Sequence, residues 1–493
     1  MGEHLTALDA TFLELEEADE SAHMHIGAIM VFEPTPDGGA PTTEQLAHHL
    51  AHRLAELPRY RQRLSELHTG GLSWPAWEDD PEFAIGRHVA HAALPAPGGD
   101  QELAEWASAF FSQRLDRRHP LWEMTLVEGL EGGRWALASK THHCMVDGVG
   151  SVDVVHLLLD VTPAVSPERS VVGAFPRATR STRRSGPREP LASLAGVWKG
   201  LVPLDTAVHA ASMGIHGMLH PREALSSARS ALEMIVREEL HGAPSSSLNQ
   251  AIGTKRRFEV LRVPLRDMKT IKNALGGTIN DVALSISASG LRALLLARGE
   301  APPEQGLRAM VPMNVRRASE QLALGNKVSS LFVDLPVAEA DAIERYFETV
   351  ARSTALKSAG QQAAGTNAVI ELAGLAPPVI HSTLAQALYA TRLFNVTITN
   401  VPGPQQTLYA FGAPLREIHP LVPLAASHSI GVAIVSYDGN AFFGVVADRD
   451  SVPDLDVMLQ EMNSCVQQLL AVADPHAHAQ PHHRQSVHAG ASS

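Results

Sequence analysis

Two adjacent histidines, followed by an acid and a glycine, form the part of this sequence best suited to chemistry. They are His142 and His143 of the run THHCMVDG, which ends in Asp147 and Gly148. An imidazole can take a proton from an alcohol or a thiol near neutral pH, and glycine permits a tight backbone bend. Neighbouring side chains on an extended backbone point to opposite sides, so we expect one histidine to face a cleft and the other to pack.

Other chemistries of the same run are less well supported. A zinc site needs a third ligand beyond a histidine and Asp147, and nothing nearby in the sequence supplies one, so we expect no metal. Cys144 as a nucleophile activated by His143 would need two neighbouring side chains to converge. We therefore interpret Cys144 as a small buried residue, and Asp147 as the partner of an arginine that holds the turn in shape.

The elements around the motif place it at the end of a strand. Residues 134–140 alternate between apolar and polar side chains, and Glu131-Gly132-Gly133 before them has the composition of a hairpin turn. After the motif, residues 149–160 have the apolar spacing of a helix. The histidines are thus predicted at the carboxyl end of a strand and just before a helix, where open α/β sheets place their chemistry.

Length and charge limit the class of protein. A chain of 493 residues with 45% hydrophobic residues predicts two domains of roughly 150–250 residues each. The formal net charge of -13 argues against a nucleic-acid partner, because binding to phosphates requires a dominant basic face.

The cysteine count and the apolar runs indicate the compartment. Two cysteines, Cys144 and Cys465, cannot build a disulfide framework, which favours a reducing compartment. The first residues lack the layout of a signal peptide, and no apolar run reaches the ~18–20 residues of a membrane span. We expect a cytoplasmic protein that at most lies on a membrane surface.

Composition divides the chain into four parts. Residues 1–165 form an expected N-terminal lobe that carries the motif, and residues 248–474 form a C-terminal lobe. Residues 166–247 are expected to be a connection that begins with a polar, basic linker at 176–188. The histidine-rich tail 475–493 shows no packing pattern and is expected to be disordered. Both lobes are predicted to be mixed α/β.

The motif resembles the HHxxxDG signature of the acyltransferase superfamily that includes chloramphenicol acetyltransferase, plant BAHD acyltransferases and nonribosomal peptide condensation domains. The chain as a whole resembles the narrower bacterial wax ester synthase/diacylglycerol acyltransferase family over roughly residues 4–472. The ordered features that carry this resemblance are Leu5-Thr6-Ala7-Leu8-Asp9, Met24-His25-Ile26-Gly27, Pro120-Leu121-Trp122-Glu123, Leu248-Asn249, Ile252-Gly253, Arg256-Arg257, Gly277-Thr278-Ile279-Asn280-Asp281-Val282, Pro312-Met313-Asn314-Val315-Arg316, Gly325-Asn326 and Asn400-Val401-Pro402-Gly403-Pro404.

The resemblance implies a fold and a reaction. The fold has two chloramphenicol-acetyltransferase-like lobes, each a mixed sheet flanked by helices, with an active-site tunnel at their interface. Acyl-CoA enters as a co-substrate from one side and a lipid acceptor from the other, and no cofactor is needed. His143 is the general base that deprotonates the acceptor hydroxyl for attack on the thioester, without a covalent acyl-enzyme.

Further site residues follow from the same resemblance. Asn280 is the candidate donor to the tetrahedral oxyanion, with Asp281 beside it, although an Asn there is equally well explained as a helix cap. Arg316 is the candidate partner of Asp147 across the lobes, and a solvated surface arginine is the alternative. Gly148 permits the bend after the motif. The candidate substrate-binding residues are Pro120, Leu121, Trp122, Asn400, Pro402 and Gly403; Trp122 fits core packing better than a substrate contact.

A lipid acceptor implies contact with a membrane or a lipid droplet. The basic linker 176–188 can attract an anionic surface, since each Lys or Arg near it contributes ~1 kcal/mol. A stripe of apolar side chains on the following helix can lie in the membrane–water interface or pack on the protein, and both alternatives stay open. This stripe consists of Leu191, Leu194, Trp198 and Leu201. We thus expect a peripheral association, and the sequence does not give the oligomeric state.

The expected function is acyl-CoA-dependent O-acylation of diacylglycerol, giving triacylglycerol, and of long-chain fatty alcohols, giving wax esters. Two alternatives stay open. One is another acyl transfer of the HHxxxDG type, such as ester or amide formation on a polyketide or from a carrier protein. The other is a lipid-binding protein without catalytic activity.

Overall fold

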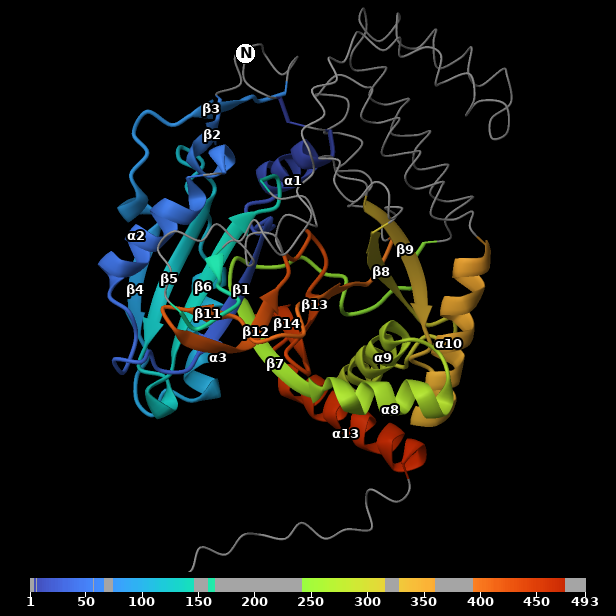
Figure 1. Ribbon diagram of the computed structural model, residues 1–493. Coiled ribbons are helices and arrows are strands. Elements are labelled where there is room, and N and C mark those ends of the chain that lie inside the picture. The colour runs from blue at the N-terminus through green and yellow to red at the C-terminus, as the bar shows by residue number, and fades with distance from the viewer. Residues whose placement is uncertain are drawn as a thin grey trace, which may run out of the picture.

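The computed structural model describes residues 4–5, 7–55, 57–65, 74–145, 158–164, 242–314, 328–359 and 393–474. Within these residues two six-stranded sheets, each with helices against it, form two lobes (Figure 1). The predicted two-lobed α/β fold is thereby confirmed. The predicted linker 176–188, the helical stripe 191–201 and the tail 475–493 lie outside the described residues.

The first sheet carries the histidine motif near its centre. Its strands in spatial order are β11 (Tyr409–Ala410), β12 (Ala413–Leu421), β1 (His25–Phe32), β6 (Trp135–His142), β5 (Trp122–Glu128) and β4 (Val89–Ala93). Strands β1 and β5 both run antiparallel to β6. The predicted strand at 134–140 is confirmed by β6, which begins one residue later and continues to the first histidine. The predicted turn before it is a short 3-10 segment, Glu131–Gly133.

Two strands of the first sheet come from the far end of the sequence. β12 pairs with β1 from Gly27 with Leu421 to Phe32 with Leu415, and β11 extends it. In Figure 1 the orange β12 accordingly lies beside the blue β1. The division of the chain at residues 165 and 248 stays a prediction, and the segment 409–421 is shared with the N-terminal sheet.

The second sheet lies entirely in the C-terminal half. Its strands in spatial order are β7 (Arg256–Pro264), β14 (Asn440–Asp448), β13 (Ile430–Tyr437), β10 (Val396–Pro402), β8 (Leu307–Asn314) and β9 (Val328–Leu335). β10 pairs in parallel with β13 and β8, whereas the remaining pairs are antiparallel. A separate small ladder joins β2 (Gln62–Leu64) to β3 (Trp77–Asp79).

Helices cover both sheets. Those of the first lobe are α1 (Ala7–Ala18), α2 (Thr43–Leu54) and α3 (Asp100–Phe111); those of the second are α8 (Leu265–Leu275), α9 (Ile279–Ala297), α10 (Ala342–Ala359) and α13 (Leu455–Ala473). Single-turn 3-10 helices lie at Pro58–Arg61 and Ile85–Arg87. The predicted helix at 149–160 lies almost wholly outside the described residues.

Helix α9 is the central core helix of the second lobe. Among the described helices it alone is long and apolar enough to span a membrane, yet 72% of its apolar window is buried inside the protein. It packs so closely on α13 that a Cβ at Gly290 would lie 2.8 Å from the carbonyl oxygen of Met458. Only glycine fits that crossing, so the apolar character of α9 is explained by packing within the lobe.

The two lobes meet along the edge of the second sheet. Strand β7 is an edge strand, and two of its backbone N–H groups meet serines at the carboxyl-terminal part of α3 in the first lobe. The hydroxyl oxygen of Ser108 accepts from Phe258 N at 2.9 Å, and that of Ser112 accepts from Arg256 N at 2.7 Å. Two serines four residues apart on a helix thus satisfy a strand edge that would otherwise be open to pairing.

Candidate active site

Strand β6 ends in the two histidines, and backbone hydrogen bonds fix the turn that they form. His142 N donates to Leu121 O at 2.9 Å, and His143 N donates to Met24 O at 2.8 Å. Met145 N then donates back to His142 O at 3.0 Å, which closes a tight turn. The expected divergence of the two side chains follows from this arrangement.

His142 points into the protein and is 1% exposed. Its Nδ1 accepts the backbone N–H of Cys144 at 3.2 Å, so the proton is carried on Nε2. Nε2 lies 3.3 Å from Oε2 of Glu16, at the end of helix α1. The contact does not meet the geometry of a hydrogen bond, so Nε2 of His142 lies against the carboxylate without a well-directed bond. His142 is therefore a packing residue, as one histidine of the pair was predicted to be.

Glu16 is a buried carboxylate that ties helix α1 to the motif. Its Oε2 accepts the Met24 backbone N–H at 3.0 Å, and its Oε1 accepts from the guanidinium of Arg114 at 2.9 Å. Burial raises the pKa of this carboxyl, but the contacts with His142, Met24 and Arg114 outweigh burial and leave the pKa well below its usual range. Glu16 is thus ionised, and it anchors Met24, whose carbonyl oxygen accepts the backbone N–H of His143.

His143 points the other way and keeps part of its surface exposed. The ring of Phe12 stacks on its imidazole, with centroids 3.9 Å apart and planes inclined by 22°. Desolvation lowers the pKa of His143 to about 4, the residue's own backbone carbonyl opposes this shift, and His142 adds to it. No other described group meets Nδ1 in standard hydrogen-bond geometry. The ring is neutral at neutral pH, with a lone pair free to accept a proton.

A lysine and the carboxyl end of helix α3 brace the strands behind the motif. Nζ of Lys140 donates to Phe110 O at 2.9 Å and to Gln113 O at 2.8 Å, and the side chain is fully buried. Nε2 of His25 donates to Phe111 O at 3.0 Å. A cation at the carboxyl end of a helix interacts favourably with the helix dipole. Because His25 pairs with His142 in the sheet, α3 supports the strand ends on which the motif lies.

Cys144 is buried in an apolar cluster with Leu13 and Leu121. Burial raises the pKa of its thiol well above the usual value, and the negative charge of Asp9 adds to this shift. A thiol of this kind is not a nucleophile at neutral pH. The interpretation of Cys144 as a small buried side chain fits these surroundings.

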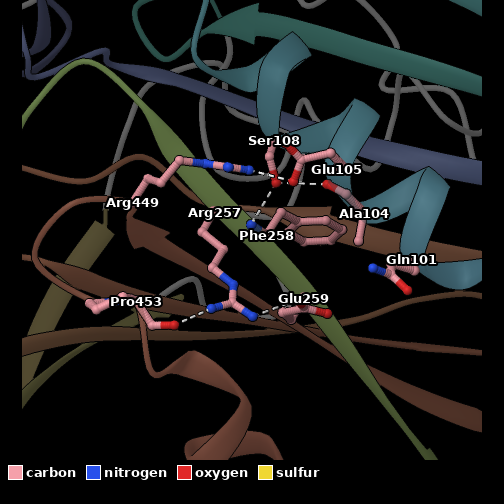
Figure 2. Close-up of a pocket in the computed structure, with 9 residues that line it drawn as sticks. All are labelled: Gln101, Ala104, Glu105, Ser108, Arg257, Phe258, Glu259, Arg449 and Pro453. Atoms are coloured by element: carbon pink, nitrogen blue, oxygen red, sulfur yellow. Dashed lines mark hydrogen bonds and ion pairs between the residues drawn. The ribbon is translucent and has the colours of Figure 1, made fainter.

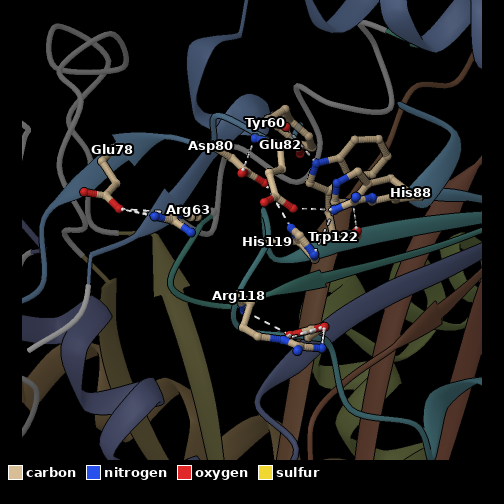
Figure 3. Close-up of polar contacts among 11 residues, drawn as sticks. Tyr60, Arg63, Glu78, Asp80, Glu82, His88, Arg118, His119 and Trp122 are labelled. Atoms are coloured by element: carbon tan, nitrogen blue, oxygen red, sulfur yellow. Dashed lines mark hydrogen bonds and ion pairs between the residues drawn. The ribbon is translucent and has the colours of Figure 1, made fainter. Parts of the chain in front are cut away.

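Trp122 is held in the core by a hydrogen bond and by stacking. Its Nε1 donates to Tyr60 O at 2.9 Å, and its indole stacks on His88 with centroids 4.5 Å apart (Figure 3). Pro120 and Leu121 beside it are also buried. Figure 3 shows the neighbouring His119 directed at Asp80, 3.1 Å from its carboxylate. These contacts explain Trp122 as a packing residue, and contact of Pro120, Leu121 or Trp122 with substrate stays a prediction.

The start of helix α9 brings together two asparagines that are 120 residues apart in the sequence. Nδ2 of Asn400, near the end of β10, donates to Oδ1 of Asn280 at 3.4 Å. The neighbouring Asp281 points inward and is 1% exposed. It closes a capping box, because its Oδ2 accepts Thr278 N at 2.8 Å while Thr278 Oγ1 accepts Asp281 N at 3.3 Å. Asp281 therefore holds the helix end, and Asn280 is left to face Asn400.

Several predicted residues do not contribute to a described site. Asp147, Gly148 and Arg316 lie outside the described residues, so their predicted ion pair and turn stay predictions. Pro402 pairs with Ser436 in the sheet, and Gly403 N lies 3.3 Å from the hydroxyl of that serine. No hydrogen bond among the described residues joins Asn280, Pro402 or Gly403 to His143.

A cavity of about 280 Å³ lies at the seam between α3 and β7 (Figure 2). The charged side chains around it are already paired: Arg449 contacts Glu105, and Arg257 contacts Glu259. None of the lining residues belongs to the motif. Across the part of the chain that the structure describes, no three His, Cys, Asp or Glu side chains are grouped to hold a metal ion.

Glu16 and Phe12 were not among the residues singled out from the sequence. They lie four residues apart, so both project from one face of α1. An acid on the same helical face as an aromatic residue was the available signal, because a glutamate on a packed face requires a partner. The partner itself, His142, is too distant in sequence for that signal to identify.

Known proteins resemble this chain over nearly its whole length. The family model described as wax ester synthase/diacylglycerol acyltransferase catalytic domain matches residues 5–283, and the WS/DGAT C-terminal domain matches residues 324–469. The "Probable diacyglycerol O-acyltransferase tgs1" of Mycobacterium tuberculosis is 33% identical over 476 residues, which cover 95% of this chain and 96% of that protein. The corresponding tgs2 protein is 30% identical over 468 residues, covering 94% and 97%.

Solved structures show the same relationship. The wax ester synthase/diacylglycerol acyltransferase from Marinobacter aquaeolei VT8 superposes with a TM-score of 0.68 at 26% identity, covering 95% of this chain and 99% of that one. The first condensation domain of the CDA synthetase superposes with a TM-score of 0.57 at 16% identity, covering 96% and 97%. At that identity the second likeness concerns the fold alone.

Proposed function

The chain belongs to the wax ester synthase/diacylglycerol acyltransferase family, and from this premise we propose how it works as a diacylglycerol O-acyltransferase and wax ester synthase. Its substrates are an acyl-CoA and an acceptor hydroxyl, carried by diacylglycerol or by a long-chain alcohol. The product is triacylglycerol in the first case and a wax ester in the second. Free CoA is released in both.

His143 is the general base of the transfer. Its imidazole accepts the proton of the acceptor hydroxyl as the oxygen attacks the thioester carbonyl carbon. The tetrahedral intermediate then collapses, the carbon–sulfur bond breaks, and the departing CoA sulfur takes the proton from the imidazolium. The reaction needs no covalent acyl-enzyme, and the buried thiol of Cys144 is not used.

One observation carries this assignment: the environment of the His143 ring. It is the histidine of the pair that keeps partial exposure, and desolvation holds its pKa at about 4 in the free protein. A neutral ring is the form that can act as a base. During attack the imidazolium forms beside a negatively charged tetrahedral intermediate, and an opposite charge at that distance favours the protonated ring. Transfer of the proton to His143 is therefore favoured as the negative charge forms on the tetrahedral intermediate.

Asn280 is the proposed donor to the oxyanion of the tetrahedral intermediate. Its side chain lies at the amino end of α9 and faces Asn400, while the cap of the helix is supplied by Thr278 and Asp281. The alternative role of Asn280 as the cap is thus filled by other residues. A helix amino terminus also favours negative charge, which supports this location for an oxyanion.

The proposal is tested by an acceptor screen with release of CoA as the readout. Purified protein with labelled palmitoyl-CoA should form neutral lipid from dioleoylglycerol and from hexadecanol, and His143→Ala should abolish both while the protein stays folded. Transfer only to an amine or to a carrier-bound acceptor would support the other HHxxxDG chemistry. Lipid binding with no transfer, unchanged by His143→Ala, would support a non-catalytic protein.

We also propose that the enzyme acts at a membrane or lipid-droplet surface, because its acceptors are apolar and the linker 176–188 is basic. Vesicle flotation with and without anionic lipid tests this location. Deletion of 176–188 should reduce binding to anionic vesicles at low salt, whereas deletion of the tail 475–493 serves as the control. Equal binding by both deletion variants and the full chain contradicts the proposed role of the linker.

A further inference from the structure

A buried arginine of the second lobe reaches into the first lobe near the motif. Arg256 is the first residue of β7, and its side chain is 1% exposed. One terminal nitrogen donates to the carbonyl oxygen of Ser21, which lies between α1 and β1. The other donates to Gly253 O at 2.7 Å in its own lobe. The planar guanidinium therefore bridges one backbone segment from each lobe.

No hydrogen bond joins the guanidinium of Arg256 to a carboxylate among the described residues. The nearest ion pair is with Asp448 at 4.0 Å, and that carboxylate already accepts Gly253 N at 2.8 Å. Burial lowers the pKa of Arg256 to about 10, so the side chain is still protonated at neutral pH. Burying such a group is costly unless its hydrogen bonds are well directed. Its directed contacts are those to backbone carbonyl oxygens, which indicates a role in holding backbone.

The segment that Arg256 holds in the first lobe leads directly to the catalytic base. Ser21 is fixed from its other side by Asp19, whose carboxylate accepts Ser21 N at 2.9 Å. Three residues later, Met24 N donates to Glu16, and Met24 O accepts the backbone N–H of His143 at 2.8 Å. The path from the second lobe to the base thus consists of a short backbone segment and consecutive hydrogen bonds.

We propose that Arg256 is an interlobe positioning residue, which sets the position of His143 according to how the second lobe docks on the first. This inference rests on the proposed function, in which His143 is the base. Strand β7 itself is seated on α3 through Ser112, whose hydroxyl accepts Arg256 N at 2.7 Å. The backbone of Arg256 is thus bound to the first lobe at Ser112, and its side chain is bound to the Ser21–Met24 segment. The position of that segment therefore depends on how the two lobes dock.

The proposal predicts that lysine cannot replace arginine at this position. Lysine keeps the charge but offers a single ammonium group, which cannot donate in two fixed directions from one plane. When only one of the two carbonyl oxygens accepts a hydrogen bond, the Ser21–Met24 segment gains freedom, and His143 is misplaced relative to the reacting atoms. A small misplacement of a catalytic group lowers turnover without weakening the binding of substrate.

Arg257→Lys is the matched control, because Arg257 is adjacent on β7 but pairs with Glu259 and Asp456 at the surface. In the full chain with palmitoyl-CoA and dioleoylglycerol, Arg256→Lys should lower kcat about tenfold or more and leave KM for palmitoyl-CoA within twofold. Hydrogen–deuterium exchange should be faster in the peptides that contain Met24 and His143. Arg257→Lys should leave all of these quantities within about twofold of the parent.

Several results would overturn the proposal: a kcat of Arg256→Lys within twofold of the control, a raised KM with unchanged kcat, or a loss of activity equal to the loss of folded protein. Arg256→Gln, which keeps a planar N–H donor without charge, provides the same kcat and KM comparison if the lysine variant does not fold. Failure of both to fold where Arg257→Lys is folded shows a structural role only and also overturns it. An active His143→Ala instead contradicts the proposed function, whatever Arg256 does.

Discussion

The end of β6 and the start of α9 each present two neighbouring polar residues, of which one is buried and the other is partly exposed. At β6, His142 is buried against Glu16, while His143 stays partly exposed under Phe12. At α9, Asp281 is buried in the capping box with Thr278, while Asn280 faces Asn400. In each pair the buried residue makes a hydrogen bond that fixes the local backbone, and the partly exposed residue retains polar atoms for another molecule.

The buried residues of these pairs should affect the stability of the fold, whereas the partly exposed residues should affect catalysis. A buried polar side chain with fixed partners contributes to the free energy of unfolding, and its loss leaves those partners unsatisfied. A side chain that retains a lone pair or an N–H group contributes to the transition state only when substrate is bound. Substitutions of the two kinds should therefore affect different measurements.

Apart from the histidines themselves, Asn280→Ala should have the largest effect on kcat. Removing a donor to the oxyanion typically costs about 10²–10³ in kcat. The capping box of Thr278 and Asp281 does not use the Asn280 side chain, so the melting temperature should hardly change. Steady-state kinetics with palmitoyl-CoA together with a thermal melt measure both quantities. A kcat within threefold of the parent would show that Asn280 does not donate to the oxyanion.

Glu16→Gln should lower the free energy of unfolding by about 2 kcal/mol, because it removes a buried charged group that accepts the backbone N–H of Met24. The contact with Arg114 contributes little of this, since that side chain is 35% exposed. Turnover should fall as well, because Met24, which holds His143, loses its anchor. Urea unfolding measures the stability. A change below about 0.5 kcal/mol would contradict an inward role for the Glu16 and His142 pair.

The pH dependence of stability should distinguish the parent from Glu16→Gln. The folded pKa of Glu16 is depressed below the ordinary value of 4.5, so its contribution is fully present above pH 4.5. That contribution is lost progressively as pH falls from 4.5 through the depressed pKa, because in this range the unfolded state takes up a proton that the folded state does not. Urea midpoints measured from pH 7 to pH 3 should fall more steeply below pH 4.5 in the parent. Parallel curves would contradict the ionised state of Glu16.

Asp281→Ala should have the smallest effect, about 1 kcal/mol of stability for the loss of a helix-capping interaction. The kcat of the folded protein should stay within about threefold, because the Asp281 carboxylate is buried and caps the end of the helix. Thermal melts and kinetics on the same sample test both statements. Loss of activity with unchanged stability would show that Asp281, and not only Asn280, faces the substrate.

The parts of the fold that rest on short sequence patterns were predictable. The strand before the motif and the divergence of the two histidines follow from alternation and from side-chain direction on an extended backbone. The family resemblance supplied the two-lobed fold and the reaction. Each of these predictions depends on residues within a few positions of one another or on motifs spread along the chain.

The contacts that support the site could not be predicted, because they join residues far apart in the sequence. Glu16 meets His142 across more than a hundred residues, and Arg256 reaches Ser21 across 235. The pairing of β12 with β1 likewise joins the two ends of the chain. No periodicity in the sequence encodes such pairs, since they form only when distant parts of the chain fold against one another.

The central claim is that His143 is the base and His142 is held by the fold. The most direct test compares kcat of His143→Gln and His142→Gln in folded protein with palmitoyl-CoA and dioleoylglycerol. We predict a loss of about 10³-fold or more for His143→Gln with an unchanged melting temperature, and a loss of about tenfold with a lowered melting temperature for His142→Gln. Equal losses, or a greater loss of kcat for His142→Gln, would contradict the assignment of the base to His143.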